Sequence, residues 1–224
     1  MNKQLPETKS DGSMSKTNWL ILLCMLASVL SWILGPNQII DLLAYSGQNL
    51  LEGRIWILFT ALFLHSDLTH LIGNMIFLYI FGNTLENELG ETWMMIPFFI
   101  GGASSFLTST IFYDPTTYQI GASAAIFTLT AIIMLVKPLK FSFYFLMPQG
   151  LVAIIYFTYN LLAVYYGFQG NISYIGHVIG FTVGIPFGIF ASKDWIKNLL
   201  ITAGLFLIYL FIIWILLNIQ TILA

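Results

Sequence analysis

The segment Gly176-His-Val-Ile-Gly-Phe-Thr-Val-Gly-Ile-Pro-Phe-Gly188 carries a glycine at every fourth position. Residues four apart lie on the same face of an α-helix. Small residues at this spacing let two helix backbones approach closely within a lipid bilayer. Such a glycine ridge most often serves packing alone, so by itself it predicts a helix–helix contact and no chemistry.

A second segment has the small residues that a partner for this helix needs. It begins Gly121-Ala-Ser-Ala-Ala125, and a short polar loop at 114–118 precedes it. His177 comes three residues before Gly180, so it points near the close-packed face of its own helix. Close approach of the two helices would bring the Ser123 hydroxyl within hydrogen-bond reach of the His177 imidazole.

The composition of the whole chain places this contact in a membrane. Of 224 residues, 58% are hydrophobic and only 8% are charged, whereas about 25% of a soluble domain is charged. Several apolar runs approach the roughly 20 residues that cross a bilayer. The sequence lacks the alternating ten-residue strands of a transmembrane barrel. It therefore predicts an all-α polytopic membrane protein.

The apolar segments divide the chain into seven expected spans. Residues 1–17 are polar and predict a disordered cytoplasmic tail, and 193–224 holds an extra C-terminal transmembrane helix after a core at 18–192. Within the core, about 35–68 mixes short apolar pieces with charges and predicts interfacial or re-entrant helices. The spans themselves are expected at 18–34, 69–86, 93–113, 121–136, 149–167, 174–191 and 198–220.

The distribution of lysines tests this count independently. With seven spans, the tail and the second, fourth and sixth loops share one side of the membrane, and the other side carries Arg54 alone. Lysine and arginine concentrate in cytoplasmic loops, so the N-terminus is expected inside and the C-terminus outside. The cations on the inner side are Lys3, Lys9, Lys16, Lys137, Lys140, Lys193 and Lys197.

Several classes of protein and site are disfavoured by the same composition. Cys24 is the single cysteine, so a disulfide framework or a cysteine-based zinc site within one chain is not expected, and neither is any other metal or cofactor. A net charge of −2 gives no sign of a nucleic-acid partner. The polar start of the chain does not resemble a cleavable secretory signal. The expected location is the cell membrane, and the oligomeric state is left open.

Polar residues from three distant segments gather at one depth in this topology. The second, fourth and sixth spans all begin on the outer side, and they begin with His70 and Asn74, Ser123, and His177 respectively. Polar side chains within spans usually face the protein interior and often mark function. A site near the outer leaflet is therefore expected.

Serine and histidine together favour acyl transfer. A serine hydroxyl becomes a nucleophile when a base such as histidine accepts its proton, and His70 and Asn74 could donate hydrogen bonds to the oxyanion. Each residue alone has an ordinary interpretation: Ser123 could bond to its own helix, and the other pair could tie loops together. Phe127, one turn after Ser123, could pack on the imidazole or simply fill the core.

These residues resemble the motifs of the rhomboid family of intramembrane serine proteases. The resemblance runs from about Arg54 to Ile189. It rests on three short patterns: His70-Leu-Ile-Gly-Asn74 resembles His-x-x-x-Asn, Gly121-Ala-Ser123 resembles Gly-x-Ser, and His177-Val-Ile-Gly180-Phe-Thr-Val-Gly184 resembles His-x-x-Gly-x-x-x-Gly.

The resemblance implies a six-helix rhomboid-like catalytic core with Ser123 as nucleophile and His177 as base, without an acidic third member. The oxyanion would be held by His70, Asn74 and the Ser123 backbone N–H. Supporting positions would be Gly121, Phe127, Gly180, Gly184 and a structural histidine, His65. Two departures stand out: Ile57 follows Trp56 where arginine is frequent, and Ala124 follows the serine where glycine is common.

The expected function is that of an intramembrane endopeptidase. It would cleave transmembrane protein substrates near the outer face of the bilayer through an acyl-enzyme intermediate. One alternative is a non-catalytic rhomboid-like factor that binds membrane proteins, a class that typically lacks the serine or the histidine. A transporter with a histidine pair is the other alternative, but it should carry charged residues deep in several spans, and the sequence offers no convincing ones.

Overall fold

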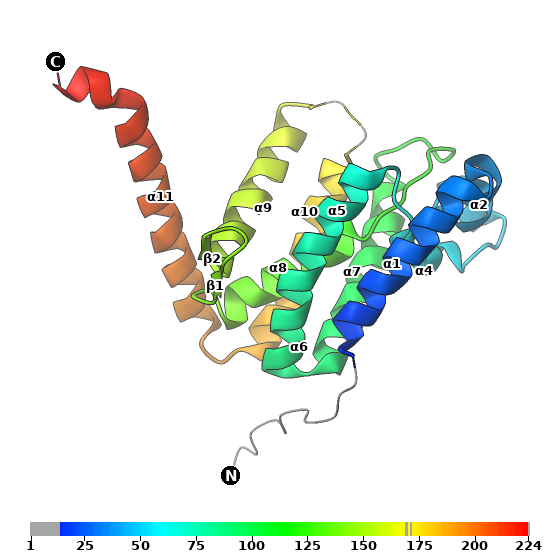
Figure 1. Ribbon diagram of the computed structural model, residues 1–224. Coiled ribbons are helices and arrows are strands. Elements are labelled where there is room, and N and C mark those ends of the chain that lie inside the picture. Colours follow the sequence, from blue (N-terminus) through cyan, green and yellow to red (C-terminus); the bar gives the residue numbers. More distant parts are fainter. Residues whose placement is uncertain (1–13, 169, 171, 224) are drawn as a thin grey trace, which may run out of the picture.

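The computed structural model describes residues 14–168, 170 and 172–223. The chain is predominantly helical, and one short antiparallel hairpin interrupts the helices (Figure 1). In chain order the described elements are α1 (Lys16–Ile33), α2 (Pro36–Leu43), α3 (Gly47–Leu51), α4 (Ile57–Thr60), the 3₁₀-helix η1 (Ala61–Phe63), α5 (Leu68–Phe77), the π-helix η2 (Leu78–Gly82), α6 (Asn83–Leu89), α7 (Glu91–Ser109), α8 (Ser123–Val136), β1 (Phe141–Ser142), β2 (Met147–Pro148), α9 (Gln149–Tyr165), α10 (Tyr174–Ala191) and α11 (Trp195–Leu223).

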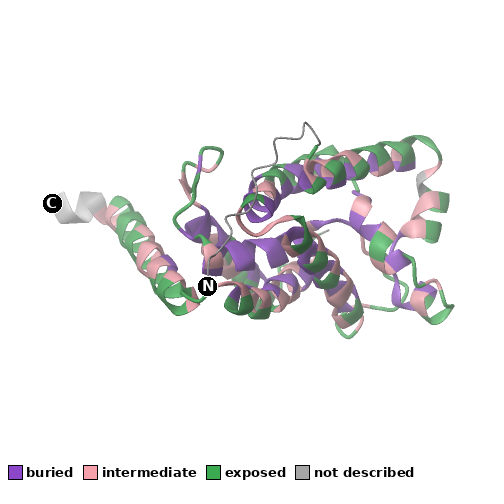
Figure 2. Cartoon of the chain, turned by 90° about the horizontal axis from the view of Figure 1, so that it is seen from below, coloured by how far each residue is buried: buried purple, intermediate pink, exposed green. Residues whose placement is uncertain are grey.

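Helix α8 is the centre of the bundle. Every residue from Ala124 to Leu135 is buried, and α7, α9 and α10 pack around it. A helix that is apolar on all sides is stable when neighbours cover all of its faces. Figure 2 shows the same concentration of buried residues in the middle of the molecule. Ser123 is therefore the first residue of the most enclosed helix.

The contact predicted from the glycine spacing is present between α10 and α8. A Cβ atom added at Gly180 would collide with Ala124 O and lie 2.8 Å from the Ala124 carbonyl carbon. At Gly188 an added Cβ would lie 2.8 Å from Leu135 Cδ1. Thr128 Oγ1 crosses the same interface, 2.8 Å from Gly180 O. Two backbones meet here because no side chain separates them.

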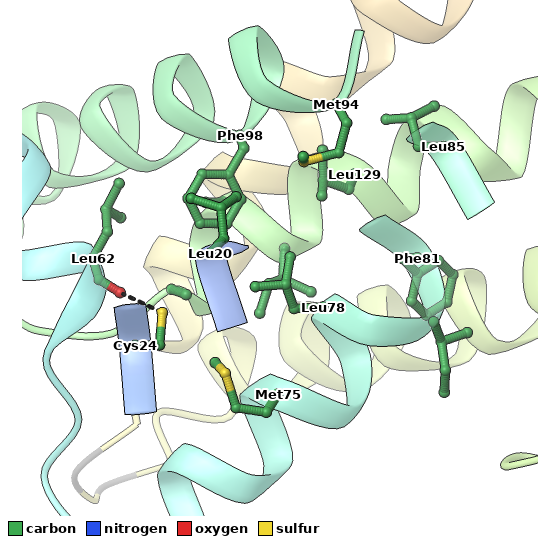
Figure 3. Close-up of a cluster of buried hydrophobic side chains, with 14 of the residues drawn as sticks. Leu20, Cys24, Leu62, Met75, Leu78, Phe81, Leu85, Met94, Phe98 and Leu129 are labelled. Carbon is green, nitrogen blue, oxygen red and sulfur yellow. Dashed lines mark hydrogen bonds between the residues drawn. The ribbon is translucent and has the colours of Figure 1, made fainter. Parts of the chain in front are cut away.

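The core on the other side of α8 is built from side chains of α1, the first loop, α5, η2 and α7. Figure 3 shows Phe98 and Leu129 packed with residues from these segments. Cys24 is fully buried among them, and its thiol donates to Leu62 O at 3.9 Å. Ordinary apolar packing therefore accounts for the single cysteine.

The segment expected to hold interfacial or re-entrant helices contains α2, α3, α4 and η1. Polar contacts tie it together: the Trp56 indole N–H donates to Leu42 O at 3.0 Å, and Arg54 pairs with Asp41 and Glu52. An isolated bridge joins Tyr45 to Gln119, just before α8. The position of this segment relative to the lipid stays a prediction.

Helix α11 stands apart from the bundle (Figure 1). Only 6% of the most apolar stretch of α11 is buried inside the protein, against 28% of the corresponding stretch of α10. Near its start, Asn198 Nδ2 donates to Leu135 O at 2.7 Å and so holds the helix to the end of α8. Beyond that point α11 presents mostly exposed apolar side chains, as expected of a helix that lipid surrounds.

Among the described residues, four helical segments are long and apolar enough to cross a membrane, and two shorter apolar helices, α8 and α9, lie between them. The seven-span count and its orientation stay predictions. The expected tail at 1–17 falls mostly on residues 1–13, outside the described part of the chain, and α1 already begins at Lys16. The four segments are Lys16–Ile33, Leu68–Leu89, Tyr174–Ala191 and Trp195–Asn218.

Candidate active site

A left-handed glycine sets the position of Ser123. Gly121 has φ = +115°, a region that side-chain-bearing residues rarely adopt. Its N–H donates to Ala61 O at 2.9 Å, and Gln119 pairs with Tyr45 through two backbone hydrogen bonds. The first loop thus anchors the strand-like approach to α8. Ser123, half-buried, follows directly as the first helical residue.

His177 packs against the first turn of α8. It lies in the first turn of α10, whose N-cap, Ser173, accepts from Gly176 N. The imidazole stacks on Phe127, with ring centroids 4.6 Å apart and planes 12° from parallel. Phe127 is one turn after Ser123, so the stack holds the imidazole over the start of the helix. No hydrogen bond joins Ser123 to His177 among the described residues, and such bonds often tighten only when substrate binds.

His70 and Asn74 lie on the opposite side, next to the loop that leads into Ser123. A Cβ atom at Gly121 would lie 3.0 Å from His70 Nε2 and 3.9 Å from Asn74 Nδ2. Both residues come from α5, where Asp67 caps the helix by accepting from His70 N at 2.9 Å. The structure therefore brings all four predicted site residues to one end of α8.

The hydrogen bonds around His70 fix where a neutral ring carries its proton. Ser66 Oγ donates to the Asp67 carboxylate at 2.8 Å, so it can only accept from His70 Nδ1, 3.2 Å away. Nδ1 then holds the proton, and Nε2 presents a lone pair toward Gly121. His70 donates from Nε2 only as an imidazolium. Asn74, by contrast, always offers amide N–H donors.

The structure adds a residue that the sequence analysis missed. Asn160 of α9 is 3% exposed, and its Oδ1 lies 2.7 Å from His177 Nδ1. The signal was present in the sequence, because asparagine interrupts an otherwise apolar span and polar residues there often mark function. What the sequence did not show was which residue it faces.

His65 lies behind His70, with ring centroids 5.0 Å apart in an edge-to-face arrangement. It is 1% exposed, and its Nδ1 lies 3.1 Å from Ser28 Oγ, which donates to Phe63 O. Burial, reinforced by the neighbouring His70, lowers the pKa of His65 to about 3. A neutral, enclosed ring between α1 and α5 fits a structural role.

The arrangement combines a hydroxyl, an imidazole and an amide around a helix N-terminus. The first N–H groups of α8 lack partners within the helix and form the positive end of its dipole, which favours a developing negative charge at this place. Within the described ranges no three metal-ligating side chains of His, Cys, Asp or Glu gather into a group. A hydroxyl beside an imidazole is a pairing that can support proton transfer and nucleophilic attack.

Comparison with known proteins identifies the family. The Rhomboid domain model matches residues 52–194. The chain is similar to Rhomboid-like protein 11, chloroplastic, of Arabidopsis thaliana (38% identical over 78 residues, 35% of this chain and 28% of the relative) and to RHOMBOID-like protein 1 of the same plant (29% over 135 residues, 60% and 34%). It is also similar to Rhomboid protease GlpG of Salmonella newport (strain SL254) (25% over 79 residues, 35% and 29%).

These alignments cover 28–34% of the length of the relatives. The family model, in contrast, spans α4 to α10 and includes every candidate site residue from His65 to Gly184. Together with the long apolar helices, the match places the protein in the bilayer. The chain belongs to the rhomboid family of integral, multi-pass membrane proteins.

Proposed function

We propose that the chain is an intramembrane serine endopeptidase that cleaves transmembrane proteins near the outer face of the bilayer. One observation carries the proposal: two distant helices, α10 with His177 and α5 with His70 and Asn74, meet at the start of α8, which begins with Ser123. The likeness to a relative named Rhomboid protease GlpG supports the same chemistry.

The reaction proceeds in two halves. Ser123 Oγ attacks the carbonyl carbon of the scissile peptide while His177 Nε2 accepts the hydroxyl proton. The tetrahedral oxyanion collapses, the C–N bond breaks, and the same proton passes to the leaving amine. Water then attacks the Ser123 ester and gives its proton to His177, and the acid product leaves as the hydroxyl reforms. No group outside Ser123, His177, substrate and water gains or loses a proton overall.

The oxyanion is held on the α5 side. Asn74 Nδ2 and the backbone N–H of Ser123 are the standing donors, and His70 adds a third donor when it is protonated. Removing one such donor typically slows catalysis by about 10²–10³-fold. The φ of Gly121 and its missing Cβ let the His70 ring lie against the loop that leads into Ser123.

Water reaches the site because α8 is short. Its 14 residues span about 21 Å at 1.5 Å per residue, against about 30 Å of hydrocarbon. We expect Ser123 then to lie below the outer surface, with the irregular backbone of 114–121 facing water or protein and not lipid. A short α8 therefore supports a cut in the outer part of a substrate span.

The alternative is a rhomboid-like factor that binds membrane proteins without cleaving them. Such factors typically lack the serine or the histidine, and this chain has both Ser123 and His177. Their placement around one helix end favours hydrolysis.

Covalent labelling separates the two functions. Purified protein in detergent is treated with a fluorophosphonate, and the adduct is mapped by mass spectrometry. We expect labelling of wild type at Ser123, none for Ser123→Ala, and strongly reduced labelling for His177→Ala. Ser104→Ala, a half-buried serine of α7, is the matched control and should label as wild type. Absence of wild-type labelling, or equal labelling of wild type and Ser123→Ala, would refute the proposed protease function.

The proposed orientation has the N-terminus in the cytoplasm, the C-terminus outside, and the cell membrane as the location. Cys24, the single cysteine, is buried, so an introduced cysteine gives a clean signal. Lys140→Cys should be shielded from an impermeant maleimide added to intact cells, and Thr116→Cys should react. The reverse pattern would overturn the orientation.

A further inference from the structure

Asn160 has no part in the reaction described above, yet it occupies a buried position beside it. On the outer half of α9, Asn160 and Ala163 are the buried residues, whereas Leu161, Leu162 and Val164 are exposed. A span that keeps its apolar side chains outward and turns an amide inward bears a desolvation cost. The amide must therefore gain specific partners there.

Both ends of the Asn160 amide are used, and together they fix its direction. Nδ2 donates to Tyr156 O, one turn earlier, at 2.8 Å. A carbonyl oxygen only accepts, so the NH₂ group faces Tyr156 and Oδ1 faces His177. The 2.7 Å contact with His177 Nδ1 is then a hydrogen bond that the imidazole donates. The proton of neutral His177 sits on Nδ1, and Nε2 keeps its lone pair.

This assignment is the one that a general base needs. The partner of one imidazole nitrogen decides which tautomer is present. With Nδ1–H bound to Asn160, Nε2 is the basic nitrogen, and the ring is held at its edge by Asn160 and on its face by Phe127. As Nε2 takes the serine proton, the bond from Nδ1–H becomes charge-assisted and strengthens. An amide gives this support without burying a second charge in the membrane.

We propose that Asn160 is a positioning residue for His177, which holds the tautomer and ring orientation that proton transfer from Ser123 requires. This role rests on the proposed protease function. The rival interpretation is that the Asn160–His177 hydrogen bond only joins α9 to α10 and so stabilises the fold. A tie contributes to stability but does not affect the protonation of His177, and that difference makes the two separable.

The test measures the rate of fluorophosphonate labelling at Ser123 from pH 5 to 9 in the full-length protein. We expect Asn160→Ala to label about 10–10²-fold more slowly, which is less than the roughly 10²–10⁴-fold that a general base contributes, because His177 is still present but no longer held. Asn160→Asp should move the midpoint of the pH profile upward, because a carboxylate stabilises the imidazolium. Asn198→Ala is the matched control: it removes an amide tie of the same length, far from the site, and should leave rate and midpoint unchanged.

Three outcomes decide the matter. If wild type does not label at Ser123, the protease function itself fails, and this role with it. If wild type labels and both Asn160 variants match it in rate and midpoint, only the positioning role fails. If the variants do not fold, the ¹⁵N spectrum of wild-type protein with labelled histidine decides, with His177→Ala for assignment: a protonated, pyrrole-type Nδ1 supports the role, and a pyridine-type Nδ1 overturns it.

Discussion

The two sides of Ser123 are built in different ways. On the α10 side, glycines bring backbone against backbone, and His177 is carried into place by the packing of a whole helix. On the α5 side, single side chains reach the loop around Gly121, and their orientation depends on local hydrogen bonds. The first kind of position can be changed only by moving a helix, whereas the second can be changed one group at a time.

The largest effect is expected from Gly180→Val. Its side chain would collide with the Ala124 carbonyl, so α10 must move away from α8 and take His177 with it. Overpacking of this kind costs about 1–3 kcal/mol or more, and labelling at Ser123 should be lost. Thermal unfolding in detergent and the labelling rate measure the two effects. Gly204→Ala, on α11 with open space around it, is the control; an active, stable Gly180→Val would contradict backbone-to-backbone packing.

Asn74→Ala should act on the α5 side without disturbing the fold. It removes one oxyanion donor, so cleavage of a single-span substrate is expected to slow by about 10²–10³-fold with little change in Tm. Gly73→Ala, the neighbouring residue with nothing near its added Cβ, serves as control. Unchanged cleavage by Asn74→Ala would leave Asn74 a structural residue.

His70→Ala should cost less, and its cost should depend on pH. In neutral His70 the single ring proton is on Nδ1, in the hydrogen bond to Ser66 Oγ. Nε2 therefore donates only when the ring is protonated. The ratio of wild-type to variant rate is therefore expected to fall as pH rises and to stay below the roughly 10²-fold of a permanent donor. Steady-state cleavage between pH 5 and 9 measures it. A ratio that is constant across this range would contradict the assigned proton position.

The difference between the two sides also explains what the sequence could predict. A glycine every fourth residue is a regular pattern, so the contact between α10 and α8 was predictable from Gly176 to Gly188. The proton position on His70 was not, because it depends on Ser66 donating to Asp67 in a loop. Asn160 shows the same limit: its presence in a span suggested function, but only the folded chain shows that it faces His177.

Stability should fall in acid because of His65, which supports the α5 side. Burial and the neighbouring His70 lower the pKa of His65 to about 3, whereas an unfolded histidine binds a proton below about 6.5. The unfolded state therefore binds more protons between these values, and stability drops as pH falls from about 6.5 toward 3, by at most about 1.4 kcal/mol per pH unit. The contribution of neutral His65 to stability is fully present above about pH 6.5.

Thermal unfolding from pH 4 to 8 tests this linkage. His65→Asn should flatten the low-pH part of the Tm curve, and Ser104→Ala, which leaves every histidine in place, should follow wild type there. If His65→Asn and wild type have curves of the same shape, the acid sensitivity arises elsewhere.

The smallest effect is expected from Thr128→Val, on the α10 side. Thr128 Oγ1 lies 2.8 Å from Gly180 O and 3.1 Å from Ala124 O, and valine keeps the shape while losing this donor. Hydrogen bonds between membrane helices contribute about 0.6 kcal/mol on average, which corresponds to a Tm lowered by roughly 2 °C for a chain of this size. Labelling at Ser123 should stay near wild type, because the glycine contacts still hold α10 in register. A large loss of activity would mean that one side-chain bond, and not backbone packing, sets the position of His177, and the contrast between the two sides would disappear.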